Sequence, residues 1–534
     1  MIKASSANLP NRRNFLQLLG VTAILMGSTS LSSQAFAEGN AEPSFPFSFD
    51  DLTARMKTMA AAPYVAPTFV LPEAYAALDY DAYRRIQFRP DRGFWAGLGK
   101  GFQVQAFHPG WLFKEPVKLF ELKDGSASPM TFTAEDFAYH DDAVAAAVKD
   151  EPFPGVAGFR LNYPLNSRQL SDELVSFLGA SYFRALGRGN AYGLSARGLV
   201  INSWVEGPEE FPVFSEFYLE RPTGGASLVV YAVLEGPSVA GAYRFEITAA
   251  HDDVQETTMD VTARLFFRAD IKEVGIAPLT SMFLFAESNR AAFDDFRPQV
   301  HDSNGLLQEH ASGEVFWRAL NNSSTLGNSY LWDNNPRAFG LYQRDRDFEQ
   351  YQDAGAHYEK RPSVRIEPIG DWGTGSVRLI EIPSKLEAED NIGAFWVPAT
   401  PVKAGDALEF RYLQRWGDLN PDGKTLAYVA ETRAGQGGVS GVENATTLRK
   451  FVIDFKGAVL DGWDPATPPD IVATVTGGEL KVSTVSKIDV NNVWRLVLDV
   501  ETVPGPAPME LKAYLVGLGR QLTETWLYQW RTAA

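Results

Sequence analysis

This chain of 534 residues contains no cysteine. That absence excludes thiol catalysis, disulfide bonds and any zinc or iron–sulfur site built on cysteine. The six histidines show no HExxH pattern or other ligand spacing, so we expect no metal and no cofactor. Beyond the N-terminal segment, no run approaches the roughly 20 apolar residues needed to span a bilayer. The sequence therefore predicts a protein that is not membrane-spanning.

Positive charge is also scarce. The chain has 49 Lys and Arg against 66 Asp and Glu, which gives a formal net charge of −17. A strongly acidic surface favours solubility and argues against nucleic acid or anionic lipid as a partner. We therefore expect no nucleic acid among its partners.

The N-terminal segment, residues 1–37, predicts an export signal. It has no acidic residue, and Arg12 and Arg13 precede an apolar stretch at 15–26 and an A-x-A cleavage site that ends at Ala37. The paired arginines followed by Asn-Phe-Leu are typical of a twin-arginine signal, and an ordinary secretory signal is the alternative. Either route predicts a periplasmic protein, cleaved after Ala37.

The remaining residues are too many for one ordinary core, and strand signals dominate them. Short runs such as 227–234 and 243–248 alternate or run apolar between turn residues. Helical signals are few, and we expect helices only near 49–59, 72–78 and 171–178. Many strands at short spacing, without βαβ alternation, predict a mostly-β protein built from sandwiches.

A break in the strand pattern predicts two domains. Two prolines and a glycine interrupt the pattern just after Trp396, so we expect a large N-terminal β-sandwich at 38–396 and a linker at 397–404. Beyond it, residues 405–534 show roughly seven alternating strands, the first of them with Leu408, Phe410 and Tyr412 on one face. That number of strands fits an immunoglobulin-like sandwich without its disulfide.

The stretch 301–396 is rich in Asp, Asn, Arg, Tyr and Trp without helical or strand periodicity. Gly, Pro and Asn-Pro pairs separate the polar groups, so the backbone reverses repeatedly. Binding and catalytic side chains commonly lie on such loops, held by a rigid scaffold. Carboxylates hydrogen-bond sugar hydroxyls, and pyranose rings lie on aromatic faces. The stretch therefore predicts a carbohydrate-binding cleft in the larger domain.

Several separate motifs resemble one known family. They are VSFLGASYFRA (175–185), YGLSARGL (192–199), RPQVHDSNGL (297–306), DNNPRAFGL (333–341), RDRDFEQYQD (344–353), KRPSVRIEPIGDWGTG (360–375), DNIGAFW (390–396) and ETWLYQW (524–530). Over nearly all of the chain after residue 37, they resemble the bacterial periplasmic glucans biosynthesis protein G/D family. The twin-arginine-like segment is similar to the export signal of D members rather than G members.

The resemblance implies a large sandwich of the galactose-mutarotase type joined to an immunoglobulin-like sandwich. It implies a role in the biosynthesis of osmoregulated periplasmic glucans, controlling the glucan backbone, with β-1,2-linked glucan as partner. It also implies an anomer-inverting endo-glucanase with Asp390 of the D-N-I motif as general acid and Asp302 of the H-D-S motif as general base. A transglycosylase that forms a cyclic glucan stays open. A homodimer and a functional link to the inner-membrane glucan synthase are further expectations.

Local sequence supports different roles for the two aspartates. Asp390 follows Glu387 and Glu389 and precedes an apolar segment at 392–396; like charge and desolvation both favour a carboxyl that keeps its proton. Asp302 is followed by a Ser-Asn-Gly turn, whose hydrogen bonds would keep a carboxylate ionised. An acid and a base require that asymmetry. Each aspartate also fits a plainer role, as an Asx-turn cap for Asp302 and a strand-end cap for Asp390.

Other side chains of the motifs are candidates for contacting glucan. The expected stacking platforms, with core packing as the alternative for each, are Trp332, Trp372 and Trp396. The polar candidates are His301, Arg346, Tyr351, Arg361, Glu367 and Glu387. Arg346 equally fits an ion-pair network with its neighbouring aspartates. Glu367 or Asp371 could replace Asp302 as base, and Glu387 or Asp371 could replace Asp390 as acid.

A function of another class also fits this sequence. A non-catalytic glucan-binding factor that assists the membrane synthase would need the aromatic platforms but no asymmetric pair of carboxyls. Release of reducing sugar from linear β-1,2-glucan distinguishes the enzyme from the binder.

Overall fold

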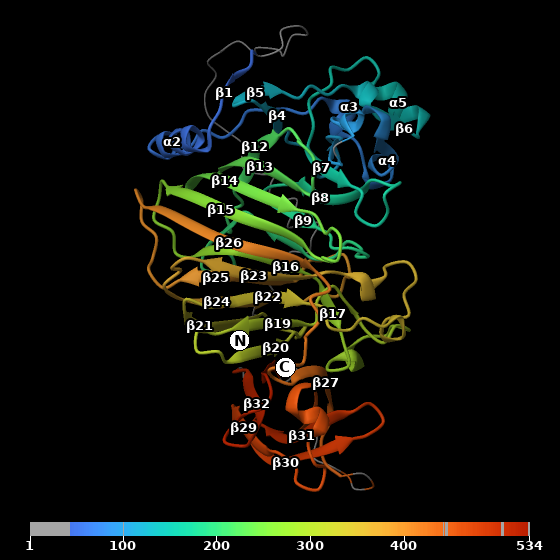
Figure 1. The fold of residues 1–534 in the computed structure, drawn as a ribbon, viewed down its shortest axis with the longest axis vertical. Helices are drawn as coiled ribbons and strands as arrows, with labels where there is room; N and C mark the ends of the chain where they lie inside the picture. Colours follow the sequence, from blue (N-terminus) through green and yellow to red (C-terminus); the bar gives the residue numbers. More distant parts are fainter. Residues whose placement is uncertain are drawn as a thin grey trace, which may run out of the picture.

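The structure is a computed structural model, and it describes residues 43–531 apart from positions 100, 440, 442, 444–446 and 504–506. The predicted export signal at 1–37 lies outside the described residues. The described chain is mostly β, as predicted, with its strands in several sheets and few helices (Figure 1).

The larger sheet runs through most of the molecule. Within the described residues it has sixteen strands, in the order β1 (Phe45–Pro46), β5 (Ser126–Pro129), β4 (Lys118–Lys123), β12 (Val213–Glu220), β13 (Ser227–Glu235), β14 (Val239–Thr248), β15 (Thr257–Phe267), β26 (Ala407–Gly417), β23 (Ser363–Ile369), β22 (Ala338–Tyr342), β19 (Gly305–Glu309), β20 (Val315–Ala319), β34 (Thr525–Trp530), β32 (Met509–Gly517) and β29 (Asp470–Thr476), with β33 (Arg520–Gln521) paired to β32. Most neighbours are antiparallel.

A second sheet packs face to face on the larger one. Its order is β21 (Gly327–Asn334), β24 (Thr374–Glu381), β25 (Ile392–Pro398), β16 (Val274–Ser281), β10 (Ser195–Arg197), β9 (Tyr182–Ala185), β8 (Asp172–Leu178), β7 (Gly158–Tyr163) and β3 (Gln103–Phe107), with β11 (Leu199–Ile201) paired to β16. The main core lies between the sheets: Phe159 contacts Phe217 with ring centroids 4.9 Å apart, and Phe177 contacts Phe245 at 5.3 Å. Alternating apolar side chains from both sheets thus build a sandwich.

Short elements surround the sandwich, and the longest helix packs on β12, β13 and β14 of the larger sheet. The small ladders are β2 (Ile86–Phe88) with β6 (Phe137–Tyr139), and β17 (Phe283–Phe285) with β18 (Val300–His301). The helices are α2 (Phe49–Ala60), α3 (Glu73–Ala76), α4 (Tyr80–Tyr83) and α5 (Asp142–Val148), and the 3₁₀ turns are η2 (Pro90–Arg92), η3 (Ala96–Leu98), η4 (Ala134–Asp136), η5 (Arg290–Ala292), η6 (Phe348–Gln350), η7 (Tyr358–Lys360) and η8 (Ala458–Gly462). Helix α2 begins at Ser48, whose hydroxyl accepts the N–H of Asp51 at 3.0 Å, and it buries Leu52 and Met56, one turn apart.

The helix predicted at 171–178 is wrong, because this segment is strand β8. Its residues Leu174, Val175 and Phe177 are all buried, and β8 pairs with β7 on one side and β9 on the other. A strand that is covered on both faces shows a continuous apolar run, which periodicity cannot distinguish from a buried helix. The other two predicted helices correspond to α2 and α3.

The C-terminal unit lies at one end of the molecule (Figure 1). One layer is the four-stranded sheet β27 (Tyr428–Gln436), β28 (Leu448–Lys456), β31 (Val493–Thr502) and β30 (Gly478–Ile488). The other layer is β34, β32 and β29, and because β34 pairs in parallel with β20, the larger sheet continues into this unit. A second core of residues from both parts, including Trp317, Trp494 and Trp526, joins the unit to the sandwich.

Strand β26 belongs to the larger sheet, between β15 and β23, and not to the C-terminal unit that we predicted to begin at residue 405. Its Phe410, Tyr412 and Trp416 point into the main core. The alternation of a strand shows which face is buried but not which neighbours it pairs with, so the break at 397–404 was placed one strand too early. The first strand of the separate four-stranded sheet is β27.

Candidate functional site

The hairpin of β17 and β18 fixes the position of Asp302. His301 pairs with Phe283, its ring stacks on the Phe283 ring with centroids 5.4 Å apart, and the N–H of Asp302 donates to the carbonyl of Met282 at 2.8 Å. Burial lowers the pKa of His301 to about 3, so the ring is neutral. Gln343 donates to the His301 carbonyl at 2.8 Å. His301, predicted to contact substrate, is fully buried and instead supports the hairpin.

The loop that carries Asp390 is tied to the same hairpin. The side-chain oxygen of Asn391 accepts the N–H of Phe283 at 2.8 Å, and its amide nitrogen donates to the carbonyls of Phe283 at 2.9 Å and Ile382 at 3.0 Å. Asn391 is buried, whereas Asp390 is partly exposed. Since Phe283 also pairs with His301, the chain brings Asp390 and Asp302 to one place, as the sequence predicted.

Asp302 is a buried carboxyl beside a guanidinium. It is 6 % exposed, and its Oδ1 lies 3.5 Å from Nη1 of Arg361. Burial raises the pKa of Asp302 to about 6; the charge of Arg361 opposes this rise, and the charge of Asp390 adds to it. The hydrogen bonds that we expected the turn after Asp302 to give its carboxylate are not formed, because the hydroxyl of Ser303 faces Ser281 at 2.8 Å and the side-chain oxygen of Asn304 accepts the N–H of Arg344 at 3.1 Å.

Tyr358 and Glu387 lie beside Asp302 and belong to the same candidate site. The Tyr358 hydroxyl donates to Glu387, and Glu387 accepts from Arg297 at 2.8 Å. Burial, followed by the charges of Glu387 and Asp302, raises the pKa of Tyr358, so its hydroxyl stays protonated. Tyr358 therefore stands within electrostatic reach of both carboxylates, a role that no motif spacing had indicated.

Two arginines also escaped sequence reasoning. Arg297 pairs with Asp295 and Asp353, each at 2.8 Å, as well as with Glu387, and this cluster fixes the loop in front of β18. Arg184 of β9 lowers the pKa of Asp302 by its charge. Only their position in space, set by the pairing of distant strands, makes them part of the site.

Two of the three predicted aromatic platforms are core residues. Trp372 is 5 % exposed and Trp396 fully buried, with ring centroids 6.2 Å apart. The indole N–H of Trp372 donates to the carbonyl of Arg411 at 3.1 Å, and its ring meets Phe410 at 5.3 Å. Neither ring offers a face to a sugar, because both pack between the two sheets.

Trp332 is exposed, at 60 %, but it is not near Asp302. It lies on edge strand β21 opposite Ser376. At the other end of β21, Gly327 pairs with Glu381, and Glu381 pairs with Ile392, which follows Asp390 by two residues. Five residues along a strand correspond to roughly 17 Å. Trp332 therefore cannot share one sugar ring with the aspartates.

Two more residues that we predicted to contact glucan, Tyr351 and Arg346, have structural roles. Tyr351 is fully buried, and its hydroxyl donates to the carbonyl of Asp345 at 3.2 Å. Arg346 donates to the carbonyls of Glu359, Arg361 and Asp418 and thereby braces the segment that carries Arg361.

Glu367 lies on β23, away from the aspartates, between Arg365 at 2.8 Å and Arg415 at 3.1 Å. Although burial raises its pKa, hydrogen bonds from these two arginines hold the pKa below its usual range, so Glu367 is an ion-pair partner. Asp371, the other proposed replacement for Asp302, caps its own turn by accepting the N–H of Gly373 at 2.9 Å.

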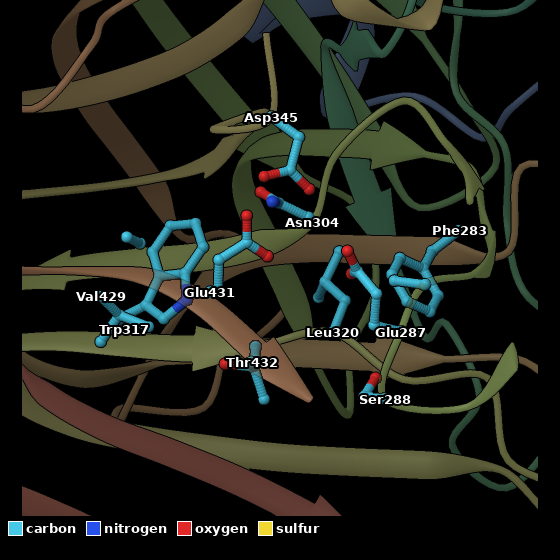
Figure 2. A pocket seen from close by; sticks show the side chains of 13 residues that line it. Phe283, Glu287, Ser288, Asn304, Trp317, Leu320, Asp345, Val429, Glu431 and Thr432 are labelled. Carbon is cyan, nitrogen blue, oxygen red and sulfur yellow. The ribbon is translucent and has the colours of Figure 1, made fainter. Parts of the chain in front are cut away.

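A separate group of acidic side chains lies where the two parts of the protein meet (Figure 2). Within the described residues, Glu287, Asp345 and Glu431 form the one group of three acidic side chains in which one carboxylate oxygen of each lies within 4.8 Å of one oxygen of both others. Neither Asp302 nor Asp390 belongs to it.

The fold and the site together define a class: a mostly-β protein whose loops gather a buried aspartate, a second aspartate, an arginine and a tyrosine, groups suited to binding and proton transfer on a hydroxyl-rich ligand. The chain belongs to the family described as "Periplasmic glucan biosynthesis protein, MdoG", whose model matches residues 47–530. In the described residues, no helix has the length and apolar character needed to cross a membrane.

Named relatives agree with this assignment. The chain is 54% identical to glucans biosynthesis protein G of Cereibacter sphaeroides over 489 residues, which cover 91% of this chain and 89% of the relative. It is 42% identical to glucans biosynthesis protein G of Vibrio cholerae over 493 residues, covering 91% and 87%. A probable glucans biosynthesis protein D of Shewanella oneidensis is 38% identical over 531 residues, covering 98% and 96%.

Proposed function

We propose that this protein acts in the periplasm on β-1,2-linked glucan, as an endo-glucanase that inverts the anomeric configuration. The family supports a role in glucan biosynthesis. The observation that carries the catalytic proposal is the buried Asp302, whose pKa is raised to about 6 and responds to the charge of Asp390. Two interacting carboxyls in different surroundings are what an inverting mechanism requires.

In this mechanism Asp302 is the general base. With a pKa of about 6, most Asp302 is ionised at pH 7, yet it is basic enough to accept a proton from water. Among the described residues, no group donates a hydrogen bond to its Oδ1, so this buried oxygen keeps a lone pair that can accept one. Arg361 holds the carboxylate from one side at 3.5 Å.

Asp390 is the general acid. Its position on the partly exposed loop before β25 lets it reach a glycosidic oxygen, to which it donates its proton as the bond to the anomeric carbon breaks. The oxygen of water forms the new bond to that carbon from the opposite face, and the proton of water passes to Asp302. Tyr358 and Glu387, beside Asp302, are placed to hydrogen-bond the sugar hydroxyls.

Purified mature protein with linear β-1,2-glucan tests the proposal, and linear β-1,3-glucan is the control substrate. We expect new reducing ends from the β-1,2-glucan only, and proton NMR should show the α anomer first. No release with tight binding retained would replace the enzyme by a glucan-binding factor that assists the synthase. A cyclic product without added water would make the protein a transglycosylase.

A further inference from the structure

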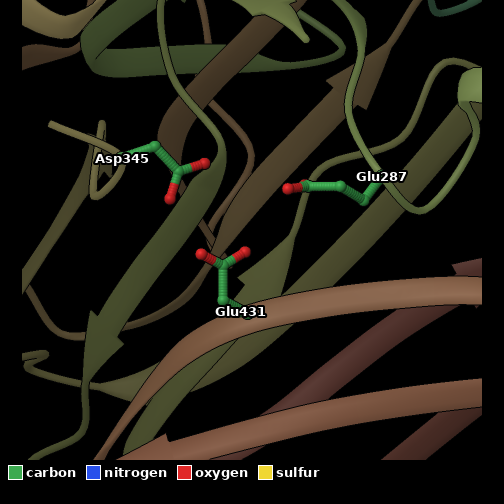
Figure 3. Close-up of side chains that lie close together, drawn as sticks. All are labelled: Glu287, Asp345 and Glu431. Carbon is green, nitrogen blue, oxygen red and sulfur yellow. The ribbon is translucent and has the colours of Figure 1, made fainter. Parts of the chain in front are cut away.

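The carboxylate cluster of Glu287, Asp345 and Glu431 joins the two parts of the protein. Glu287 follows β17 and Asp345 follows β22, both in the sandwich, whereas Glu431 lies on β27 of the C-terminal unit. Their side chains point toward one another across the junction (Figure 3). A cavity of about 30 Å³ lies among them, lined also by Asn304, Trp317 and Thr432 (Figure 2). The cluster therefore belongs to the contact between the units.

Among the described residues of the sandwich, no charged side chain forms an ion pair with Glu287 or Asp345 that would offset the cluster. Asp345 is 5 % exposed and accepts from Gln299 at 2.9 Å. The ring of His301 lies 3.9 Å from Asp345, but burial lowers the pKa of His301 to about 3, so it carries no charge. Tyr351 is neutral as well, since burial raises its pKa, and Arg346 uses its guanidinium on carbonyls and Asp418.

The arginines of the C-terminal unit that lie near Glu431 are also paired with another carboxylate, that of Asp454. Arg433 lies 3.4 Å from Glu431, but it also pairs with Asp454 at 2.9 Å. Arg495 of β31 binds Asp454 at 2.8 Å and reaches Glu431 only by its longer-range charge. Gln350 donates to Glu431 at 3.3 Å. Counted together, the carboxylates facing this junction outnumber the available cations.

These three adjacent carboxylates, one buried and two half-buried, cannot all be ionised at little cost, because like charges repel strongly where water is scarce. A proton shared between two of them replaces that repulsion by a short hydrogen bond. Burial, with the neighbouring carboxylates, raises the pKa of Asp345 to about 7 and that of Glu431 to about 9. The pKa directions thus agree with the geometry.

We propose that a proton shared among Glu287, Asp345 and Glu431 holds the C-terminal unit against the sandwich, and that its loss loosens this contact. Deprotonation would add a negative charge to a junction that already holds adjacent carboxylates from both parts. The contact between the two parts should therefore loosen at alkaline pH and not at acidic pH.

The cluster is also linked to the candidate site. The side-chain amide of Gln299 donates to Asp345 at 2.9 Å, its oxygen accepts from Nε2 of His301 at 3.0 Å, and His301 directly precedes Asp302. A loosened junction would therefore reach the hairpin that holds Asp302. This consequence rests on the proposed function, whereas the proton-dependent contact does not.

The direction of the pH effect follows from linkage. In the unfolded chain these carboxyls have a pKa of about 4, so between that pH and their raised folded values the folded state binds more protons. Their contribution to stability is complete below about pH 4 and is lost as pH rises through about 7 for Asp345 and 9 for Glu431. Asp302 titrates near pH 6, so a window from pH 7 to 9.5 isolates the cluster.

Thermal melts of the mature protein between pH 7 and 9.5 test the proposal, for the wild type, Glu431→Gln, Asp345→Asn and the exposed control Glu479→Gln. We expect the Tm of wild type and control to fall by roughly 4 °C or more across this window, and the fall to shrink by at least half in both cluster variants. Hydrogen exchange at 428–431, corrected for intrinsic rate, should rise about tenfold in the wild type and the control but not in the two cluster variants.

Two results would overturn the proposal. One is that both cluster variants keep the full alkaline fall in Tm. The other is that Ca²⁺ or Mg²⁺ raises the Tm of the wild type at pH 8 but not that of Glu431→Gln, because the cluster would then bind a cation in place of a proton. If Glu431→Gln fails to fold, Asp345→Asn decides the question. None of these measurements uses glucan, so they stand apart from any failure of the proposed activity.

Discussion

At the scale of single residues, the protonation of Asp302 sets how the rate should depend on pH. The base must be ionised, so kcat/KM should fall as pH drops through about 6. The charge of Arg361 holds this pKa down, and Arg361→Met should move the acidic limb upward by about one pH unit or more. Arg361→Lys keeps the positive charge, so the acidic limb of this variant should stay close to its wild-type position. A limb that does not move in Arg361→Met would show that this contact does not tune Asp302.

Trp372 should matter for stability and not for glucan binding. Its ring fills space between the sheets, so Trp372→Ala should lower the free energy of unfolding by about 3–5 kcal/mol. The exposed Trp332 is the matched control, and Trp332→Ala should change the free energy of unfolding by less than about 0.5 kcal/mol. Urea denaturation measures both. A Trp372→Ala protein of normal stability with weakened glucan binding would restore the stacking role.

The sequence allowed the two aspartates to be predicted, because each lies in a short motif of the family. It did not allow the aromatic residues to be assigned: Trp372 and Trp396 have the same chemistry whether they face a sugar or a neighbouring sheet. Burial is a property of the whole fold, and so is the raised pKa of Asp302, which the adjacent turn residues had seemed to oppose.

At the scale of elements, Asn391 fastens the loop of Asp390 to strand β17. Asn391→Ala would leave the buried N–H and carbonyl of Phe283 without partners, at a cost of about 2 kcal/mol or more, and would free the loop. We therefore expect lower stability and lower turnover together, measured by urea denaturation and by release of reducing ends. Asn334→Ala, on the exposed end of β21, is the control. Normal turnover in a folded Asn391→Ala protein would contradict this role.

Strand patterns reveal faces but not partners, and this limited what the sequence could show of the topology. The alternation of β26 is evident in the sequence, but its pairing with β15 and β23 is not. The apolar run of β8 also fits a buried helix, because β8 is covered on both faces and paired on both sides. In each case the deciding contact comes from strands far away in the chain.

At the scale of the whole molecule, a buried ion pair also joins the two units. The guanidinium of Arg344 donates to both oxygens of Glu524, at 2.8 and 2.7 Å, and lies 3.6 Å above the ring of Trp317. Glu524→Gln would leave Arg344 buried without its counter-charge, so we expect a loss of about 3–5 kcal/mol in unfolding free energy. Breaking the exposed pair of Lys403 and Asp270 by Asp270→Asn should cost far less, because solvent screens that pair. Equal effects in urea denaturation would contradict the buried role of Arg344.

The central claim is that Asp302 and Asp390 together cleave glucan, and Asp390→Asn tests it most directly. The change keeps the shape of the side chain and removes the transferable proton, so turnover of linear β-1,2-glucan should fall by about 10²–10⁴ while glucan affinity largely survives. A thermal melt confirms folding, and proton NMR follows the anomer. We predict that the wild type releases the α anomer and that Asp390→Asn is folded and nearly inactive. A well-folded Asp390→Asn protein with near-normal turnover would contradict the account.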